Sequence, residues 1–338
     1  MPDEAALLEL LSRPTPAVVE AMAALDGDLL ILGAGGKMGP SLARLARRGS
    51  DEAGGRRRVI AVARFSEPGL AAALREHGVE TIPCDLFDRA QLAGLPEAPN
   101  LVYMVGQKFG TTGEEARTWA INAYLPGAVA ERYSGARIAA FSTGNVYPLA
   151  PIESDGPVET DPVGPIGEYA RSALARERVL EFFSRRNGTP MAILRLNYAI
   201  EPRYGVLRDI ADRVRAGEPL DLAMGRVNVI WQRDANAIAL RALAHCAVPP
   251  LVLNLTGRPA VTVRRVAERF ARRWGVEPVF EGVEATTALL SNAARMEALF
   301  GKPEVGVEEM ISRVAEWVEQ DGRSLGKPTH FEEREGRF

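Results

Sequence analysis

Cysteine, histidine and long apolar runs are all scarce in this chain of 338 residues. Its two cysteines, Cys84 and Cys246, form no CxxC pair and no cluster with the three histidines, so a metal site is not expected. No apolar run approaches the ~20 residues that cross a bilayer. No basic segment followed by an apolar one begins the chain. We therefore expect a cytoplasmic protein with two buried free thiols and no membrane contact.

An excess of positive charge is also missing. The formal net charge is -3 and the sequence pI is about 5.9, whereas a nucleic-acid-binding surface usually needs a basic face and a high pI. We therefore expect no nucleic-acid partner, and instead a small-molecule substrate. Most basic residues are arginine, and the lysines are Lys37, Lys108, Lys302 and Lys327.

What the chain does have is an alternation of short apolar runs with helical patterns. Strands are predicted at residues 29–32, 59–63, 79–84, 101–105, 138–141 and 191–196. The helices between them imply βαβ units, and right-handed crossovers place helices on both faces of a parallel sheet. The predicted fold class is therefore α/β, a doubly wound parallel sheet whose ligands bind at the carboxyl ends of the strands.

The two ends of the chain and its second half are organised differently. Residues 1–27 carry two helical patterns before the first strand, which we interpret as an appended cap or an oligomer contact. Residues 28–190 are expected to form the sheet domain, and residues 191–321 mainly a smaller lobe interleaved with it. Residues 322–338 are polar and charged, so this C-terminal tail is expected either to be disordered or to fold over the body.

A glycine-rich loop follows the first predicted strand. Gly33, Gly36 and Gly39 form a GxxGxxG pattern between that strand and the next helix. In such a loop the first glycine makes the tight turn, the second lets the backbone approach a pyrophosphate, and the third lets the helix pack on the sheet. Free N–H groups at the helix start then favour the phosphates. The loop predicts a dinucleotide site in residues 28–190, with Lys37 either on a phosphate or in water.

The residue after the second predicted strand bears on which dinucleotide is bound. NAD-binding proteins usually carry an acid there, which holds the ribose 2′-OH. This chain has Arg64, whose guanidinium suits the 2′-phosphate of NADP. NADP is therefore preferred over NAD as the expected cofactor, although a solvent-exposed arginine would also explain the residue in so arginine-rich a chain.

Further motifs occur in order along the chain: CDLFD after the third strand, YMVGQK after the fourth, STGNVY after the fifth and LRLN in the sixth. This series resembles the extended short-chain dehydrogenase/reductases of the NAD-dependent epimerase/dehydratase family, over about residues 28–320. The resemblance implies a Rossmann domain that binds NAD(P) and a smaller C-terminal lobe that binds the substrate. It also makes a homodimer an expected assembly.

The resemblance assigns roles to individual residues. It implies that the glycine loop, with Lys37 and Met38, holds the cofactor. It further implies that Asp85 and Leu86 contact the adenine and that Lys108 lies on the cofactor phosphates. The implied catalytic residues are Tyr169, Thr143 and Asn122, of which Asn122 braces the active site.

Candidate substrate residues lie beyond the fifth and sixth strands, where this fold lines its substrate cleft. They are Asn145, Asn197, Tyr198, Arg203 and Tyr204. An arginine at this place suits a carboxylate or a phosphate. The segment that contacts the nucleotide in the epimerases is matched only loosely around Arg226, so a nucleotide sugar, a free sugar and a sugar acid all stay open. Trp231 either stacks on a substrate ring or lies buried.

The sequence departs from the family at the catalytic helix. The family carries YxxxK, whereas Tyr169 is followed four residues later by Ala173. Residues i and i+4 share a helix face, and a lysine there would favour the phenolate through its opposite charge. Arg171 falls on the wrong face and Arg176 almost two turns along, so neither is expected to replace the lysine.

Three functions stay open from the sequence. The first is an NAD(P)-dependent ketone reductase or epimerase acting on a sugar-like or polyhydroxy substrate, with reduction favoured because a neutral Tyr169 phenol can donate a proton. The second is a non-catalytic NAD(P)-binding sensor or scaffold. The third is a lyase or isomerase built on Asn145, Tyr198 or Asp234. A 4,6-dehydratase is disfavoured, because Gly144 and Asn145 stand where those enzymes carry an Asp-Glu pair.

Overall fold

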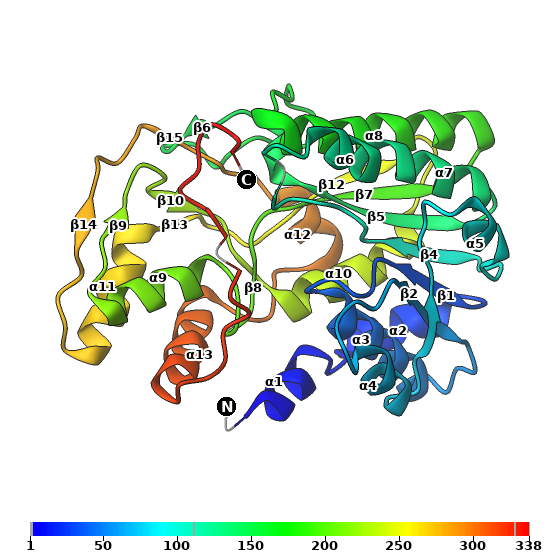
Figure 1. Cartoon of the computed structure of the whole chain (residues 1–338), viewed down its shortest axis with the longest axis horizontal. Helices are drawn as coiled ribbons and strands as arrows, with labels where there is room; N and C mark the ends of the chain where they lie inside the picture. The colour runs from blue at the N-terminus through cyan, green and yellow to red at the C-terminus, as the bar shows by residue number, and fades with distance from the viewer. Residues whose placement is uncertain (1–2, 111, 328, 338) are drawn as a thin grey trace.

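A computed structural model describes residues 3–110, 112–327 and 329–337. At its centre is a seven-stranded sheet with the order β12-β7-β5-β4-β1-β2-β3, in which every neighbouring pair is parallel (Figure 1). The strands are β1 (Leu29–Leu32), β2 (Val59–Ala63), β3 (Glu80–Pro83), β4 (Asn100–Tyr103), β5 (Arg137–Thr143), β7 (Met191–Leu196) and β12 (Leu251–Leu255). The strand order reverses between β1 and β4, which confirms the predicted doubly wound α/β fold.

Helices cover both faces of the sheet, so its strands are apolar on both sides (Figure 1). In β1, Leu29 and Ile31 pack into one core and Leu30 and Leu32 into the other, and all four are fully buried. The first face is covered by α2 (Pro16–Ala24), α3 (Gly39–Glu52), α4 (Leu70–Glu76), α10 (Gln232–Ala242) and α12 (Ala294–Phe300). The second is covered by α5 (Arg89–Gly94), α7 (Leu125–Arg132) and α8 (Gly167–Asn187).

The connection between β4 and β5 differs from the single helix predicted there. It consists of α6 (Glu115–Trp119), the π-helical turn η1 (Ala120–Tyr124) and α7. Pro126 lies in the first turn of α7, and its ring nitrogen has no hydrogen to donate to the preceding turn. The wider π turn contains Asn122, which is fully buried. Such turns are frequent at functional sites.

A smaller lobe is built from the second half of the chain, around a core of its own. Its helices are α9 (Val206–Ala216), α11 (Val263–Trp274) and α13 (Val307–Glu319). Its paired two-residue strands are β6 (Ala150–Pro151) with β15 (Thr287–Ala288), β8 (Ala199–Ile200) with β11 (Ile230–Trp231), β9 (Leu220–Asp221) with β14 (Phe280–Glu281), and β10 (Arg226–Val227) with β13 (Val261–Thr262). Strands this short carry no periodicity, so the sequence did not predict their pairing.

The N-terminal helices pack within the chain. Leu7 and Leu11 of α1 (Glu4–Leu11) are fully buried in the core of the smaller lobe. Val18 and Met22 of α2 are fully buried in the sheet core, where α2 contacts α3 and α10. The two helices therefore join both cores, which the interpretation as an appended cap did not anticipate.

The C-terminal tail folds over the body, which is one of the two outcomes that the sequence left open. Figure 1 shows it in red, crossing from the smaller lobe to the sheet domain. Phe331 is fully buried in the core of the smaller lobe. The Arg334 guanidinium donates to the carbonyl oxygen of Thr287 at 2.8 Å, and Gly336 packs against the backbone of Ile166 at the start of α8. The tail thus fastens the two parts of the protein together.

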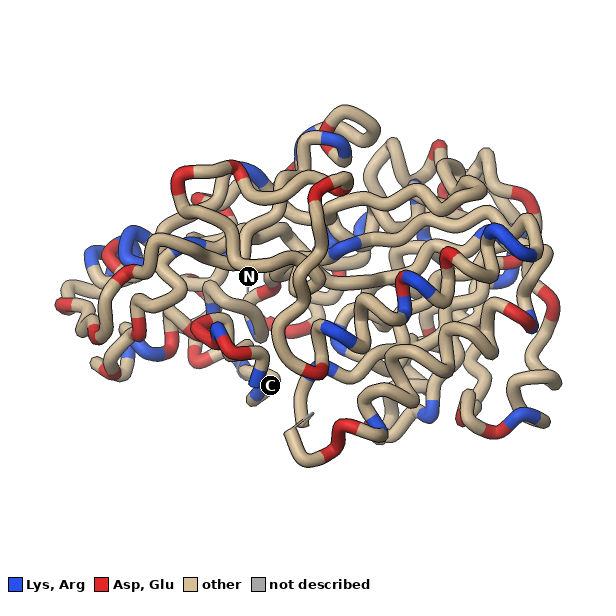
Figure 2. The backbone as a smooth tube through the Cα atoms, turned by 90° about the horizontal axis from the view of Figure 1, so that it is seen from above, with Lys and Arg blue, Asp and Glu red and all other residues tan. Residues whose placement is uncertain are grey.

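Charge is spread evenly over the molecule. Basic and acidic residues are intermingled along the whole backbone (Figure 2). Among the residues that the structure describes, none of the helices has the length and apolar character needed to span a membrane.

One ion pair lies deep between α8 and the sheet. Arg195 of β7 and Glu177 of α8 are separated by 2.7 Å, and their side chains are only 5% and 4% exposed. The Ser142 hydroxyl of β5 donates to the Glu177 carboxylate at 2.5 Å, and Arg195 donates to the Tyr147 hydroxyl at 2.6 Å. These bonds compensate both charges for the loss of water and tie α8 to β5 and β7.

We expect Glu177→Gln to lower the free energy of unfolding by about 3 kcal/mol, because it leaves the buried Arg195 without its counter-ion. The control on the same helix is Glu181→Gln, which removes partners of the exposed Arg178 and Arg185 and is expected to cost about 0.5 kcal/mol or less. Urea denaturation of both variants beside the parent measures the difference. Equal losses would show that the buried pair contributes no more than a surface pair.

Candidate functional site

The glycine loop lies between β1 and α3, at the switch point of the sheet. Gly33 has φ +87°, and a Cβ there would lie 2.8 Å from the Val105 nitrogen. A Cβ on Gly39 would lie 2.4 Å from the Ala34 carbonyl oxygen. At Gly36 the nearest protein atom would be 3.5 Å away, an ordinary contact. The fold itself thus requires glycine at 33 and 39 but not at 36, where the open space fits the close approach of a pyrophosphate.

A cavity of about 310 Å³ lies at the carboxyl ends of the central strands. It brings together most of the site residues predicted from the sequence, drawn from the glycine loop, the loop after β4, the end of β5, α8 and the loop after β7. They are Gly33, Gly36, Lys37, Met38, Gly39, Lys108, Thr143, Asn145, Tyr169, Asn197, Tyr198 and Tyr204. The glycine loop and a candidate catalytic tyrosine therefore open into one space.

Tyr169 and Thr143 meet inside this cavity. Their side chains share a hydrogen bond, which lowers the pKa of Tyr169, but burial has the larger effect and raises that pKa above its ordinary value. The Thr143 hydroxyl also donates to the Asn145 side-chain oxygen at 2.9 Å. Thr143 ends β5, and Asn145 lies in the short helix η2 (Gly144–Val146) that follows. The phenol is therefore held neutral at physiological pH beside a second hydroxyl.

Asn122 does not line the cavity but lies directly behind it. Its side-chain oxygen accepts from the Gln107 backbone N–H at 2.9 Å and from Arg176 at 2.7 Å. Its amide nitrogen donates to the Gln107 carbonyl and to the Ser172 hydroxyl, both at 2.9 Å. Asn122 thus connects the loop after β4 to α8.

Arg176 is the site residue that the sequence interpretation set aside. Arg176 is 6% exposed and lines the cavity, and its guanidinium donates to the Phe141 carbonyl oxygen at 2.8 Å as well as to Asn122. Its charge lowers the pKa of Tyr169. Seven residues span nearly two full helical turns, so Arg176 returns to the face of Tyr169. The expectation that Arg176 lies too far along the helix is therefore wrong, and the i, i+7 spacing was the signal that could have found it.

The remaining cofactor candidates lie outside the cavity, at the neighbouring strand ends. Arg64 follows β2 and is exposed. Asp85 is exposed, and its carboxylate accepts from the Phe87 backbone N–H at 3.0 Å, which is the turn-capping role of an aspartate. Leu86 is half-buried against the sheet core. All three are on the side of the glycine loop where β2 and β3 end.

The structure gives Arg203 and Lys108 partners that the sequence interpretation did not name, and it places Trp231 in the buried one of its two predicted positions. Arg203 does not line the cavity, since Glu201 and Glu4 engage its guanidinium at 3.0 Å and 2.5 Å. Lys108 lines the cavity, but its ammonium donates to the Thr329 carbonyl of the tail at 3.3 Å, on the side of the smaller lobe. Trp231 is fully buried in the lobe core, so it packs and does not stack on a ligand.

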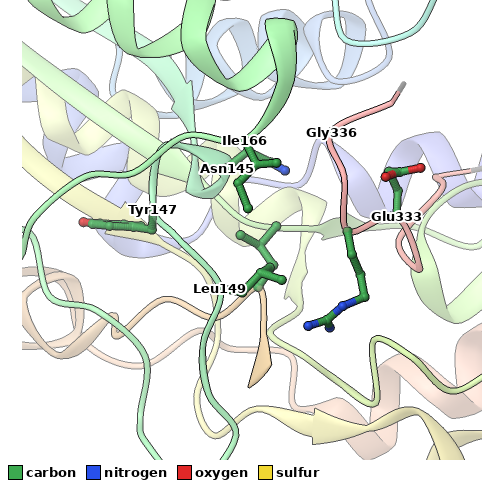
Figure 3. Close-up of a pocket in the computed structure, with 8 residues that line it drawn as sticks. Asn145, Tyr147, Leu149, Ile166, Glu333 and Gly336 are labelled. Atoms are coloured by element: carbon green, nitrogen blue, oxygen red, sulfur yellow. The ribbon is translucent and has the colours of Figure 1, made fainter. Parts of the chain in front are cut away.

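A small hollow of about 20 Å³ adjoins the main cavity (Figure 3). Asn145 lines both spaces, and Glu333 and Gly336 of the tail line the hollow. The space is enough for about one water molecule. The tail therefore closes over the residues that follow β5. Among the described residues, no group of three or more His, Cys, Asp or Glu side chains is placed to hold a metal ion.

We expect Gly36→Ala to fold with the stability of the parent, within about 0.5 kcal/mol. Its added methyl group fills ligand space, so it should weaken binding of NADPH by about tenfold or more. Gly39→Ala should instead unfold more easily, because its Cβ meets the Ala34 backbone. Thermal denaturation and NADPH fluorescence titration measure the two effects, with Gly94→Ala as a control in open space. Undiminished NADPH binding by Gly36→Ala would rule out a phosphate at this position.

A family of known proteins matches the part of the chain that contains the glycine loop and most of the central sheet. The model of the "NAD dependent epimerase/dehydratase family" matches residues 29–253, which is more than half of the chain. A search of curated proteins found no match.

Solved structures with the same fold are distant in sequence. A UDP-glucose 4-epimerase from Thermotoga maritima, solved with UDP-glucose, has a TM-score of 0.72 at 18% identity, covering 87% of this chain and 99% of its own. A UDP-glucuronic acid 4-epimerase from Bacillus cereus, solved with NAD, has 0.72 at 15%, with coverage of 87% and 99%. A dTDP-glucose 4,6-dehydratase from Streptomyces venezuelae, with NAD and TYD bound, has 0.73 at 17%, with coverage of 87% and 97%. From the family model, the chain belongs to the NAD-dependent epimerase/dehydratase family.

Proposed function

We propose that this protein is an NADP(H)-dependent oxidoreductase that interconverts a ketone and a secondary alcohol on a sugar-like or polyhydroxy substrate, with reduction favoured over epimerisation. One observation carries the proposal: Tyr169, Thr143 and Arg176 meet in the cavity into which the glycine loop opens. A proton donor, an oxygen-binding hydroxyl and a positive charge are the groups that carbonyl reduction needs beside a dinucleotide.

The residues present fit a dinucleotide. Gly36 leaves space for the pyrophosphate, the N–H groups at the start of α3 face the same side, and Arg64 is exposed at the end of β2, where it would contact a 2′-phosphate. When bound, the nicotinamide supplies the hydride for reduction. The protein's own part is to hold the substrate carbonyl and to deliver the proton.

Tyr169 would deliver that proton. Because burial raises its pKa, the phenol is protonated at neutral pH and can donate to the carbonyl oxygen as the oxygen gains negative charge. Thr143 would hold the same oxygen by a hydrogen bond. Removing a proton from an alcohol requires the phenolate instead, and the raised pKa opposes it. This asymmetry favours reduction.

Arg176 would take the electrostatic role of the absent lysine. A guanidinium near the phenol stabilises the phenolate that remains after proton donation. Because Asn122 and the Phe141 carbonyl hold the guanidinium in place, its charge is fixed before the substrate arrives.

The lyase alternative is weakened in one respect, because Asp234 accepts from the Val305 N–H at 2.9 Å and lies outside the cavity.

We expect Arg176→Met to raise the pKa of Tyr169, because it removes the positive charge that favours the phenolate. Ultraviolet difference titration, with the spectrum of Tyr169→Phe subtracted, measures this shift without any substrate. The exposed Arg178 of the same helix provides the control, Arg178→Met, which should leave the titration unchanged. An unchanged Tyr169 titration in Arg176→Met would remove Arg176 from the catalytic group.

The same variants should slow oxidation of NADPH by a panel of keto sugars. Tyr169→Phe should abolish it, and Arg176→Lys should retain more activity than Arg176→Met. NADPH binding with no oxidation by any compound of the panel would favour the non-catalytic sensor. A cofactor that stays bound through turnover would favour an epimerase.

We expect Arg64→Ala to weaken NADP+ binding by about tenfold, because hydrogen bonds to a charged group contribute about 1.5–3 kcal/mol. Binding of NAD+, which has no 2′-phosphate, should be unchanged. Calorimetric titration with both nucleotides measures the ratio, and Arg56→Ala, at the amino end of β2, is the control. An equal loss for NAD+ and NADP+ would contradict the preference for NADP.

A further inference from the structure

The charged side chains that line the main cavity are all basic. Its lining includes Lys37, Lys108 and Arg176 and, among the residues that the structure describes, no carboxylate. Arg176 is already engaged by Asn122 and the Phe141 carbonyl. The two lysines are half of those in the chain. Burial lowers the pKa of both lysines, and an anionic ligand beside their ammonium groups would favour the protonated form of each.

Lys37 comes from the glycine loop but points away from it. Its ammonium donates to the Ala199 carbonyl at 2.8 Å and lies 3.9 Å from the centre of the Tyr204 ring. Ala199 belongs to β8 of the smaller lobe, and Tyr204 lies in the segment that follows β8. The Lys37 ammonium is therefore on the side of the smaller lobe, whereas the cofactor phosphates are expected at the start of α3.

Lys108 approaches the same wall from the loop after β4. Its ammonium donates to the Thr329 carbonyl and lies 5.6 Å from the centre of the Tyr198 ring. The acidic groups that act on the two lysines are Glu201, Asp209 and Glu332. Glu201 pairs with Arg203 at 3.0 Å and Glu332 with Arg213 at 2.8 Å, whereas Asp209 accepts from the Thr329 hydroxyl and backbone N–H. Among the described residues, none of these carboxylates forms an ion pair with Lys37.

We propose that Lys37 and Lys108, together with the hydroxyls of Tyr198 and Tyr204, bind the carboxylate of a small polyhydroxy or keto acid. The inference rests on the proposed function, because this acid would be the compound whose carbonyl Tyr169 protonates. Arg203, the sequence-based candidate for such an anion, cannot serve, since Glu201 and Glu4 neutralise it.

The C-terminal tail limits the size of this acid. Thr329 lines the cavity and is fixed to Asp209 by hydrogen bonds of 2.8 Å and 2.5 Å. The fully buried Phe331 anchors the next part of the tail. The volume of the cavity, about 310 Å³, is at the low end for ligand sites and must also admit the nicotinamide end of the cofactor. This space therefore favours a free acid over a nucleotide-linked sugar.

Matched pairs of probes test the carboxylate directly. D-glucuronate and D-glucose, and D-gluconate and D-glucitol, each differ in having a carboxylate or a hydroxymethyl group at one end, whereas L-tartrate and L-threitol differ in this way at both ends. We expect the full-length protein, saturated with NADP+, to bind at least one acid about tenfold more tightly than its neutral partner in calorimetric titrations. If no acid exceeds its neutral partner, the proposal is overturned.

Variants of individual lysines then test which of them binds the acid. Lys37→Met should abolish the preference for the acid, and Lys108→Met should reduce it, whereas Lys302→Met at an exposed position should not. If Lys37→Met weakens NADP+ as much as it weakens the acid, Lys37 serves the cofactor and the proposal is overturned. If an acid binds in a Lys37-dependent way but no dinucleotide binds, the subsite stands and the proposed function fails.

Two further readouts address protonation and size. Burial lowers the pKa of Lys37 to about 7, and Glu201, Arg203, Asp209 and Lys108 are the charged groups that act on it. A bound carboxylate would raise that pKa, so binding of the acid at pH 8 should be accompanied by uptake of a proton. Calorimetric titration in buffers of different ionisation enthalpy measures this uptake, and Lys37→Met should lose it.

UDP-glucuronate should bind more weakly than D-glucuronate. Tighter binding of the nucleotide sugar would overturn the assignment to a small acid.

Discussion

The buried pair of Glu177 and Arg195 fixes where α8 lies, and the arrangement of the candidate site residues follows from that position. Arg195 is in β7, the neighbour of β5, and Glu177 accepts from both Arg195 and the Ser142 hydroxyl of β5. A shift of α8 along the sheet would separate two buried charges, which is costly. Because a helix is rigid over two turns, the same anchor sets Tyr169 against the end of β5.

The absence of lysine from the catalytic helix changes how positive charge reaches Tyr169. Arg176 lies next to Glu177 in sequence, and its guanidinium is held by Asn122 and by the Phe141 carbonyl of β5. The positive charge beside the phenol therefore depends on the folded protein, because α8 carries the guanidinium while η1 and β5 supply its hydrogen-bond partners. The π turn η1 places the side-chain amide of Asn122 between the loop after β4 and α8, and this amide bonds to both.

The end of the cavity that faces the smaller lobe is shaped by segments that are far apart in the chain. Lys37 reaches across from the glycine loop to Ala199, and Lys108 reaches the tail at Thr329. The tail in turn bonds to α9 through Asp209. A site assembled from these segments is bordered by the tail, and the charged side chains among its described lining residues are basic.

Much of the framework was predictable from local patterns. The apolar runs that became the sheet, the glycine loop and the places of Thr143 and Tyr169 follow from periodicity, from glycine spacing and from motif order. Prediction failed where a side chain could reach several partners. Arg203 was expected to bind an anion but is paired with Glu201 and Glu4. Arg176 was set aside on distance along the helix, although two turns return it to the same face.

The sequence by itself determined the doubly wound sheet, the glycine loop and the missing lysine, because each depends on residues close together in the chain. Only the tertiary structure decided which charge stands beside Tyr169, where Lys37 and Lys108 point, and whether the tail covers the site. Those outcomes depend on contacts between residues up to 221 positions apart, as for Lys108 and Thr329. Long flexible side chains take their direction from burial and from available partners, and neither exists before the chain has folded.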